Sequence, residues 1–127
     1  MGRLIIDADV MIDMLRGHTA ACDFFAVNRK NICLSVVTLT ELLAGFISAK
    51  EERAILEIAS YLVKIPVEEA VAIKAGYLRH RYGKSHGTGI IDCIVAATAQ
   101  ALDARVVSLN EKHYPMLDNV LVPYRKH

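Results

Sequence analysis

Acidic side chains interrupt apolar segments at several points of this sequence. Asp7, Asp9 and Asp13 lie in IIDADVMID, Glu41 lies in TLTELLAGF, and Asp92 lies in GIIDCIVAATAQAL. Carboxylates held a few ångströms apart raise one another's pKa unless a cation compensates their charge. Oxygen ligands of this kind suit Mg²⁺ or Mn²⁺. If the fold brings them together, they predict a metal site that could activate water and clamp a phosphodiester.

Two of these acids also fit ordinary helix caps. Glu41 follows Thr38 by three residues, which is the spacing of a capping box. Asp92 follows Gly89 by three and could cap the helix that begins there. Its apolar neighbours would bury Asp92, however, and burial of a carboxylate is costly without a partner. Structural and chemical roles therefore both stay open for this pair.

The three acids of IIDADVMID differ in how well a turn, a helix cap or an ion pair explains them. Asp7 at a strand end could form a turn, but it is harder to explain as a cap. Asp9 fits the N-cap of the first helix, which leaves it only a supporting part in chemistry. Asp13 lies three residues before Arg16, so a surface ion pair is the role expected for it.

Hydrophobic periodicity predicts alternating strands and helices. The expected strands are 4–6, 32–37, 64–67, 105–109 and 120–122, and the expected helices are 9–16, 20–27, 38–46, 50–61, 68–82 and 90–102. This order predicts an α/β fold, a three-layer α/β/α sandwich around a parallel five-stranded sheet. With 127 residues the chain is expected to form a single domain over 1–127.

Four positions fall where such a sheet would gather them. Asp7 ends the first strand, Glu41 lies one helical turn beyond the second, Asp92 opens the helix 90–102, and Asn110 follows the fourth strand. Ligands of parallel α/β sheets bind where the carboxyl ends of the strands converge. The four side chains are therefore expected in one crevice.

Composition limits the classes of partner. Fifteen basic and fourteen acidic residues give a net charge of +1, which argues against binding nucleic acid or membrane by bulk charge. No segment is long and apolar enough to span a bilayer and no signal peptide is evident. Three cysteines without CxxC spacing indicate free thiols and a cytoplasmic location. Near-neutral charge and 54% hydrophobic residues favour a homodimer.

Local cations are concentrated in RHRYGKSHG, shortly before Asp92. Arg79, Arg81, Lys84 and His86 are the residues expected to contact phosphates of a nucleic acid. Cations at a helix C-terminus are equally well explained by the helix dipole.

The ordered motifs IIDADVMID, SVVTLTELLAG, GIIDCIVAATAQAL and RVVSLNEKHYPML resemble those of PIN-domain ribonucleases, specifically the VapC-type toxins of toxin–antitoxin pairs. The resemblance covers essentially the whole chain. It implies an endoribonuclease that depends on Mg²⁺ or Mn²⁺, acts on RNA, leaves 5′-phosphate and 3′-hydroxyl ends, and is inhibited by an antitoxin.

Position by position, the resemblance makes Asp7, Glu41 and Asp92 metal ligands, one of which helps to orient the attacking water. Asn110 matches a fourth position that is Asp in many PIN domains. A neutral amide there would hold a second metal more weakly, so catalysis with one metal is a live alternative. Asp9 stands where the family often has a small hydroxyl or amide residue, and the extra acid could compensate.

The same residues are compatible with three other classes of protein. The DADV motif also resembles the nucleophile loop of haloacid-dehalogenase-type phosphatases, with Asp7 accepting the phosphoryl group and Asp9 assisting, but Glu41 would then have no role. A receiver-type phosphorylation module would need an Asp at the end of the third strand, where Pro66 and Val67 stand. A PIN-like module that binds RNA or protein without cutting is the third alternative.

Overall fold

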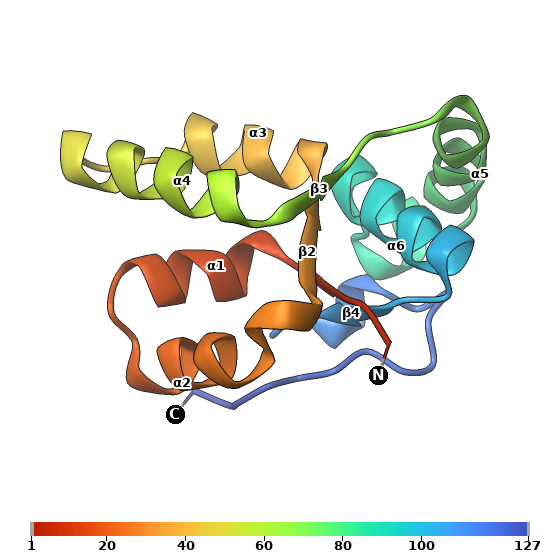
Figure 1. The fold of residues 1–127 in the computed structure, drawn as a ribbon. Coiled ribbons are helices and arrows are strands. Elements are labelled where there is room, and N and C mark those ends of the chain that lie inside the picture. Colours follow the sequence, from red (N-terminus) through yellow and green to blue (C-terminus); the bar gives the residue numbers. More distant parts are fainter. Residues whose placement is uncertain (1, 127) are drawn as a thin grey trace.

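The structure, a computed structural model, describes residues 2–126. Helices and strands alternate along most of the chain (Figure 1). The strands are β1 (Leu4–Ile6), β2 (Ile32–Ser35), β3 (Val63–Ile65) and β4 (Arg105–Val107). The α-helices are α1 (Ala8–Leu15), α2 (Thr19–Asn28), α3 (Val36–Ala44), α4 (Ala49–Tyr61), α5 (Glu69–His86) and α6 (Ile90–Leu102), and two 3₁₀ turns cover Arg29–Asn31 and Glu111–His113.

The strands form one parallel sheet in the order β3-β2-β1-β4. Strand β3 lies at an edge, where Pro66 stops the strand because proline has no N–H to donate. The predicted α/β/α sandwich with a parallel sheet is confirmed. Whether residues 1–127 fold as a single domain stays a prediction.

The prediction of a fifth strand at 120–122 was wrong in extent. Within residues 2–126 this segment forms only an isolated parallel bridge, Val107 with Leu121, next to β4. The Leu121 N–H donates to the Val106 carbonyl at 2.8 Å and its carbonyl accepts from the Ser108 N–H at 3.1 Å. Pro123 follows two residues later and cannot extend the ladder.

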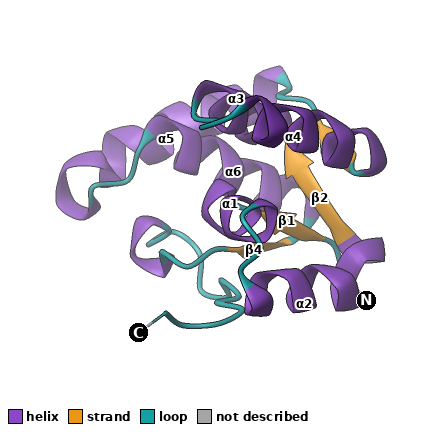
Figure 2. Ribbon diagram, turned by 90° about the vertical axis from the view of Figure 1, so that its left-hand side faces the viewer, coloured by secondary structure: helices purple, strands orange, loops and turns teal. Residues whose placement is uncertain are grey.

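Helices cover both faces of the sheet. Helices α1, α2 and α4 lie on one face, while α6 lies on the other with α5 packed against it (Figure 1). Helix α3 contacts α1, α4 and α6. Figure 2, turned by 90°, shows the strands crossing the middle of the molecule among these helices.

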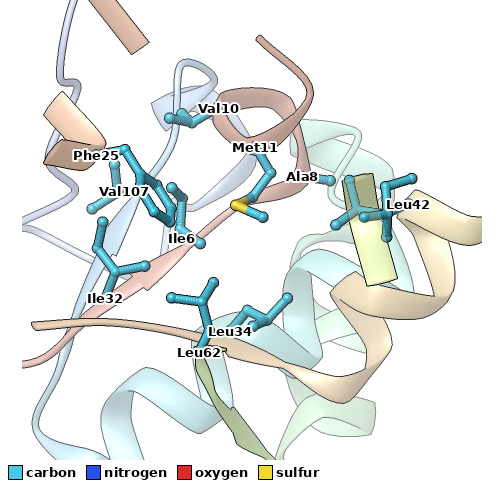
Figure 3. Packing of buried hydrophobic residues seen from close by; sticks show 11 residues of the cluster. Ile6, Ala8, Val10, Met11, Phe25, Ile32, Leu34, Leu42, Leu62 and Val107 are labelled. Carbon is cyan, nitrogen blue, oxygen red and sulfur yellow. The ribbon is translucent and has the colours of Figure 1, made fainter. Parts of the chain in front are cut away.

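Alternate side chains of each strand pack into different clusters. Ile6 and Val107 point to the α1 side, where they meet Met11 and Phe25 (Figure 3). Ile5 and its neighbours on β2 and β4 point to α6 instead. This alternation follows from the two-residue repeat of a strand. Because the sheet is buried on both faces, the strands are held rigidly and fix the positions of the residues that follow them.

Among residues 2–126, no helix combines the length and hydropathy that crossing a membrane would require.

Candidate active site

Asp7 follows β1 and is the buried centre of the acidic residues. Its side chain is 8% exposed, and Asp7 is the N-cap of α1, since its Oδ1 accepts from the Ala8 N–H at 2.8 Å. Its Oδ2 accepts from the hydroxyls of Ser108 at 2.9 Å and Tyr114 at 2.8 Å. The expectation that Asp9 would cap this helix was therefore wrong, because the chain turns into the helix one residue after β1.

Asp9 lies in the first turn of α1 and faces the loop after β4. Its Oδ2 accepts from the Leu109 N–H at 2.9 Å and lies 3.3 Å from the Ser108 hydroxyl and 3.4 Å from the Asn110 side-chain nitrogen. The fourth predicted position, Asn110, thus stands beside Asp9, to which its amide donates. The Ser108 hydroxyl is shared between Asp7 and Asp9, which holds the two carboxylates together.

Asp92 enters from the other side, on the first turn of α6. The Gly89 N–H donates to its Oδ2 at 3.3 Å, so the predicted cap is confirmed. Its Oδ1 lies 3.5 Å from the Tyr114 hydroxyl, and the Nδ1 of His113 lies 3.6 Å from its Oδ2. Because Tyr114 also donates to Asp7, one phenol stands between two of the predicted ligands.

Glu41 lies on α3, which begins at Val36 after the N-cap Ser35. The capping-box interpretation of Thr38 and Glu41 was wrong, because this helix starts three residues earlier than that motif requires. Glu41 is solvent-exposed. Its carboxyl group nevertheless lies near the other acids, whose charges act on it.

The charges of these acids act on one another. Partial burial, followed by the charge of Asp7, raises the pKa of Asp9 to about 6. Burial and then the charges of Asp7, Asp92 and Asp9 raise the pKa of Glu41 to about 7. The pKa of Asp92 is also raised, by burial and then by Asp7. Residues from three helices thus share one negative electric field, and a cation would relieve their repulsion.

The donor set fits a hydrated hard cation. Within the described residues 2–126, no three His, Cys, Asp or Glu side chains stand close enough to hold one ion as they lie. Mg²⁺ keeps several of its waters and takes only one or two carboxylates from a protein. The acids of this site ionise less readily while their negative charges are uncompensated. A divalent cation with part of its water shell would supply the missing positive charge.

Sequence analysis missed three residues of this site. Ser108 and Tyr114 hold the acids by hydrogen bonds, and His113 lies beside Asp92. The available signal was their place on the loop after β4, at the carboxyl edge of the sheet. Tyr114 is 1% exposed and packs in the cluster under α6, so its apolar ring gave no hint of a polar role for its hydroxyl.

Tyr114→Phe is expected to lower kcat/KM about tenfold for the RNA cleavage that the sequence resemblance implies. The ring stays in its cluster, but Asp7 loses a donor, and a hydrogen bond to a charged group contributes about 1.5–3 kcal/mol. The free energy of unfolding should fall by a comparable amount in urea titrations. Tyr61→Phe, at a position that is 66% exposed, is the matched control, and equal activity of the two variants would contradict a positioning role for the Tyr114 hydroxyl.

The predicted phosphate-binding cations lie on the last turns of α5. The Arg79 guanidinium packs over Gly83, and that of Arg81 lies 5.4 Å from the centre of the Tyr82 ring. The Nδ1 of His86 is 2.6 Å from the Ser85 hydroxyl. These contacts stay within α5. Together with Lys84, which is exposed near the end of the helix, the group remains a prediction as an RNA-binding surface.

Asp13 does not pair with Arg16 as expected. Arg16 instead binds Glu51 on α4, with Nε to Oε2 at 3.0 Å. Asp13 binds two residues near the C-terminus, the Tyr124 hydroxyl at 2.8 Å and the Lys126 Nζ at 2.7 Å. Both partners are distant in sequence, so spacing along a helix could not reveal them.

Comparison with known proteins places this geometry in a family. A family model described as PIN domain matches residues 4–116. Ribonuclease VapC10 of Mycobacterium tuberculosis is 36% identical over 124 residues, which cover 95% of this chain and 92% of that protein. Ribonuclease VapC19 of the same organism is also 36% identical over 124 residues, covering 94% of this chain and 98% of its own.

Solved structures show the same fold. A toxin–antitoxin complex from Klebsiella pneumoniae contains a chain with a TM-score of 0.82 and 22% identity, covering 98% of this chain and 100% of its own. DNA-bound VapBC from Salmonella typhimurium contains one with a TM-score of 0.76 and 24% identity, covering 95% and 96%.

Proposed function

The chain belongs to the PIN-domain family, and from that premise we propose that it is a metal-dependent endoribonuclease, the toxin of a VapC-type toxin–antitoxin pair. Its 36%-identical relatives are named ribonucleases. One geometric observation carries the proposal: Asp7 shares the Tyr114 hydroxyl with Asp92 and the Ser108 hydroxyl with Asp9. Asp7 and Asp9, near the start of the chain, therefore meet Asp92 of α6 at the carboxyl edge of the sheet.

Asp7, Asp92 and Glu41 are proposed as the metal-holding residues, with Asp9 and Asn110 in support. When bound, a divalent cation supplies Lewis acidity at the scissile phosphate and offsets the charge that develops there. Mg²⁺ or Mn²⁺ suits these oxygen donors. Asn110 brings no charge, and its amide already donates to Asp9, which favours a single ion over a pair.

The chain's own residues then have distinct tasks. Tyr114 and Ser108 hold the Asp7 carboxylate in a fixed orientation by donating to its Oδ2. Glu41, which lies near the other acids, is the carboxylate proposed to orient the attacking water. The remaining acids exclude RNA unless their charge is compensated, so metal should aid substrate binding as well as the chemical step.

The cations on α5 and the partners of the protein extend this proposal. Arg79, Arg81, Lys84 and His86 are proposed to contact RNA phosphates beside Asp92. The structural relatives are toxin–antitoxin and VapBC complexes, which supports an antitoxin partner whose basic segment enters the acidic crevice. A homodimer and a cytoplasmic location are also proposed.

Family membership argues against the phosphatase alternative. In that class Glu41 would have no role, whereas here burial and the charges of Asp7, Asp92 and Asp9 raise its pKa, which places it in the same acidic site. The silent RNA-binding module is the alternative that an experiment must separate.

The proposed function is tested by cleavage of end-labelled RNA in Mg²⁺, in EDTA, and in EDTA with Mg²⁺ restored in excess. We expect cleavage only when the ion is free, with internal bonds cut and 5′-phosphate ends formed. Metal-independent RNA binding without cleavage would contradict the proposal in favour of the silent module, and phosphate release from small monoesters would favour the phosphatase.

A further inference from the structure

The last residues of the chain are held by α1. This C-terminal strap, residues 122–126, has no helix or strand, but Asp13 of α1 binds both the Tyr124 hydroxyl and Lys126 Nζ. The Tyr124 ring stacks on His18, with ring centres 4.7 Å apart. The Asp13 side chain is only 14% exposed. These contacts bridge more than a hundred residues of sequence and fix the path of the strap (Figure 1).

The strap forms one wall of a hollow beside the acids. Asp9, Leu109 and Asn110 line the same hollow. The full lining consists of Asp9, Leu109, Asn110, Val122, Tyr124, Arg125 and Lys126. Because Asp9 and Asn110 belong to the candidate active site, the hollow adjoins that site.

Arg125 is the cation of this hollow whose charge is least compensated. Its side chain is 70% exposed, and its ion pair with the half-exposed Glu111 is 3.4 Å long. An exposed pair of this kind contributes little. Lys126, in contrast, lies 2.7 Å from Asp13. A guanidinium with free donors at the edge of a polar hollow is suited to bidentate binding of phosphate.

We propose that the strap is a phosphate-binding subsite for RNA, in which Arg125 binds a backbone phosphate next to the scissile bond. This inference rests on the proposed function. Tyr124, Lys126 and Asp13 act as positioning residues that hold the strap against α1. RNA fits this hollow better than a basic protein segment, because Arg125 would repel the latter.

The test compares Arg125→Ala with Arg29→Ala. Arg29 is also exposed, but it precedes β2 and so lies at the opposite edge of the sheet. Arg125→Ala is expected to raise KM for the RNA pool about tenfold with kcat nearly unchanged, and to reduce the slope of log affinity against log salt by about 1. Arg29→Ala should leave both quantities at the wild-type value.

A binding measurement separates this inference from the proposed function. Fluorescence anisotropy with a labelled single-stranded RNA of mixed sequence, in the Asp7→Asn background, should show the same loss for Arg125→Ala. Wild-type protein that cuts no RNA would contradict the proposed function. The anisotropy would still show whether Arg125 of the strap binds RNA. Equal RNA affinity of the Arg125→Ala and Arg29→Ala proteins would overturn the phosphate-binding role proposed for the strap, whether or not the wild type cuts RNA.

The positioning role proposed for Tyr124 can be tested separately. Tyr124→Phe keeps the stacked ring and removes the bond to Asp13, so KM should rise less than in Arg125→Ala. The same change made in the Arg125→Ala background should have no further effect on KM, because neighbouring residues that act through one group are not additive. Additive effects, or a fall in kcat at constant KM, would overturn the role assigned to the strap. Arg125→Lys should recover part of the affinity.

Discussion

Asp92→Asn is expected to lower kcat/KM for RNA by at least about 100-fold, the loss typical for removing one electrostatic contact to a transition state. The amide oxygen can still accept from the Gly89 N–H, so the cap of α6 is kept. Charge is what the variant loses. Its melting temperature should be equal to or above that of the wild type, because repulsion from Asp7 disappears.

The control for Asp92 stands at the other end of the same helix. Asp103 is the C-cap of α6 with φ of 51°, a left-handed conformation that Asn adopts readily. Asp103→Asn should therefore keep both fold and activity. If Asp92→Asn were as active as Asp103→Asn and equally dependent on metal, Asp92 would be a helix cap and no part of the reaction.

Asp7→Asn is expected to remove cleavage almost entirely, because Asp7 is the acid that shares hydroxyl donors with both Asp9 and Asp92. The fold should survive this change. Hydroxyls can donate or accept, so Ser108 and Tyr114 can rotate to accept from the new amide. Loss of a buried charge also relieves Asp9 and Asp92, which offsets weaker hydrogen bonds, and thermal unfolding should show a change of only a few degrees.

Asp23→Asn, on the exposed side of α2, is the matched control for a change of one Asp to Asn. Cleavage should be measured by single-turnover kinetics together with circular dichroism on the same samples. Loss of activity that accompanied loss of helical signal would contradict the account, since Asp7 would then be needed for folding.

Much of the fold could be predicted because the spacing of apolar residues indicates where helices and strands lie. The apolar run of α6 and the short buried strands are local patterns, and parallel order follows from their alternation. The segment 120–122 shows where prediction from local patterns fails. Its Val and Leu residues fit a strand, but only the pairing of Leu121 with β4 is made, and the stop at Pro123 decides its length.

The acids could be predicted as a set, while their contacts could not. Asp7 follows β1, Glu41 lies on the helix that follows β2, and Asp92 lies in the first turn of α6, so topology alone brings them near. Tyr114 and Asp13 have roles set by partners about a hundred residues away. No local pattern encodes such partners, and only the folded chain reveals them.

The most direct test of the central claim is cleavage of a mixed structured RNA pool with Mg²⁺, with Mn²⁺ and with EDTA, using wild-type and Asp7→Asn proteins purified identically. We expect cleavage by the wild type alone, and only when a divalent ion is present. Equal cleavage by both proteins, or cleavage by the wild type that persists in EDTA, would contradict it.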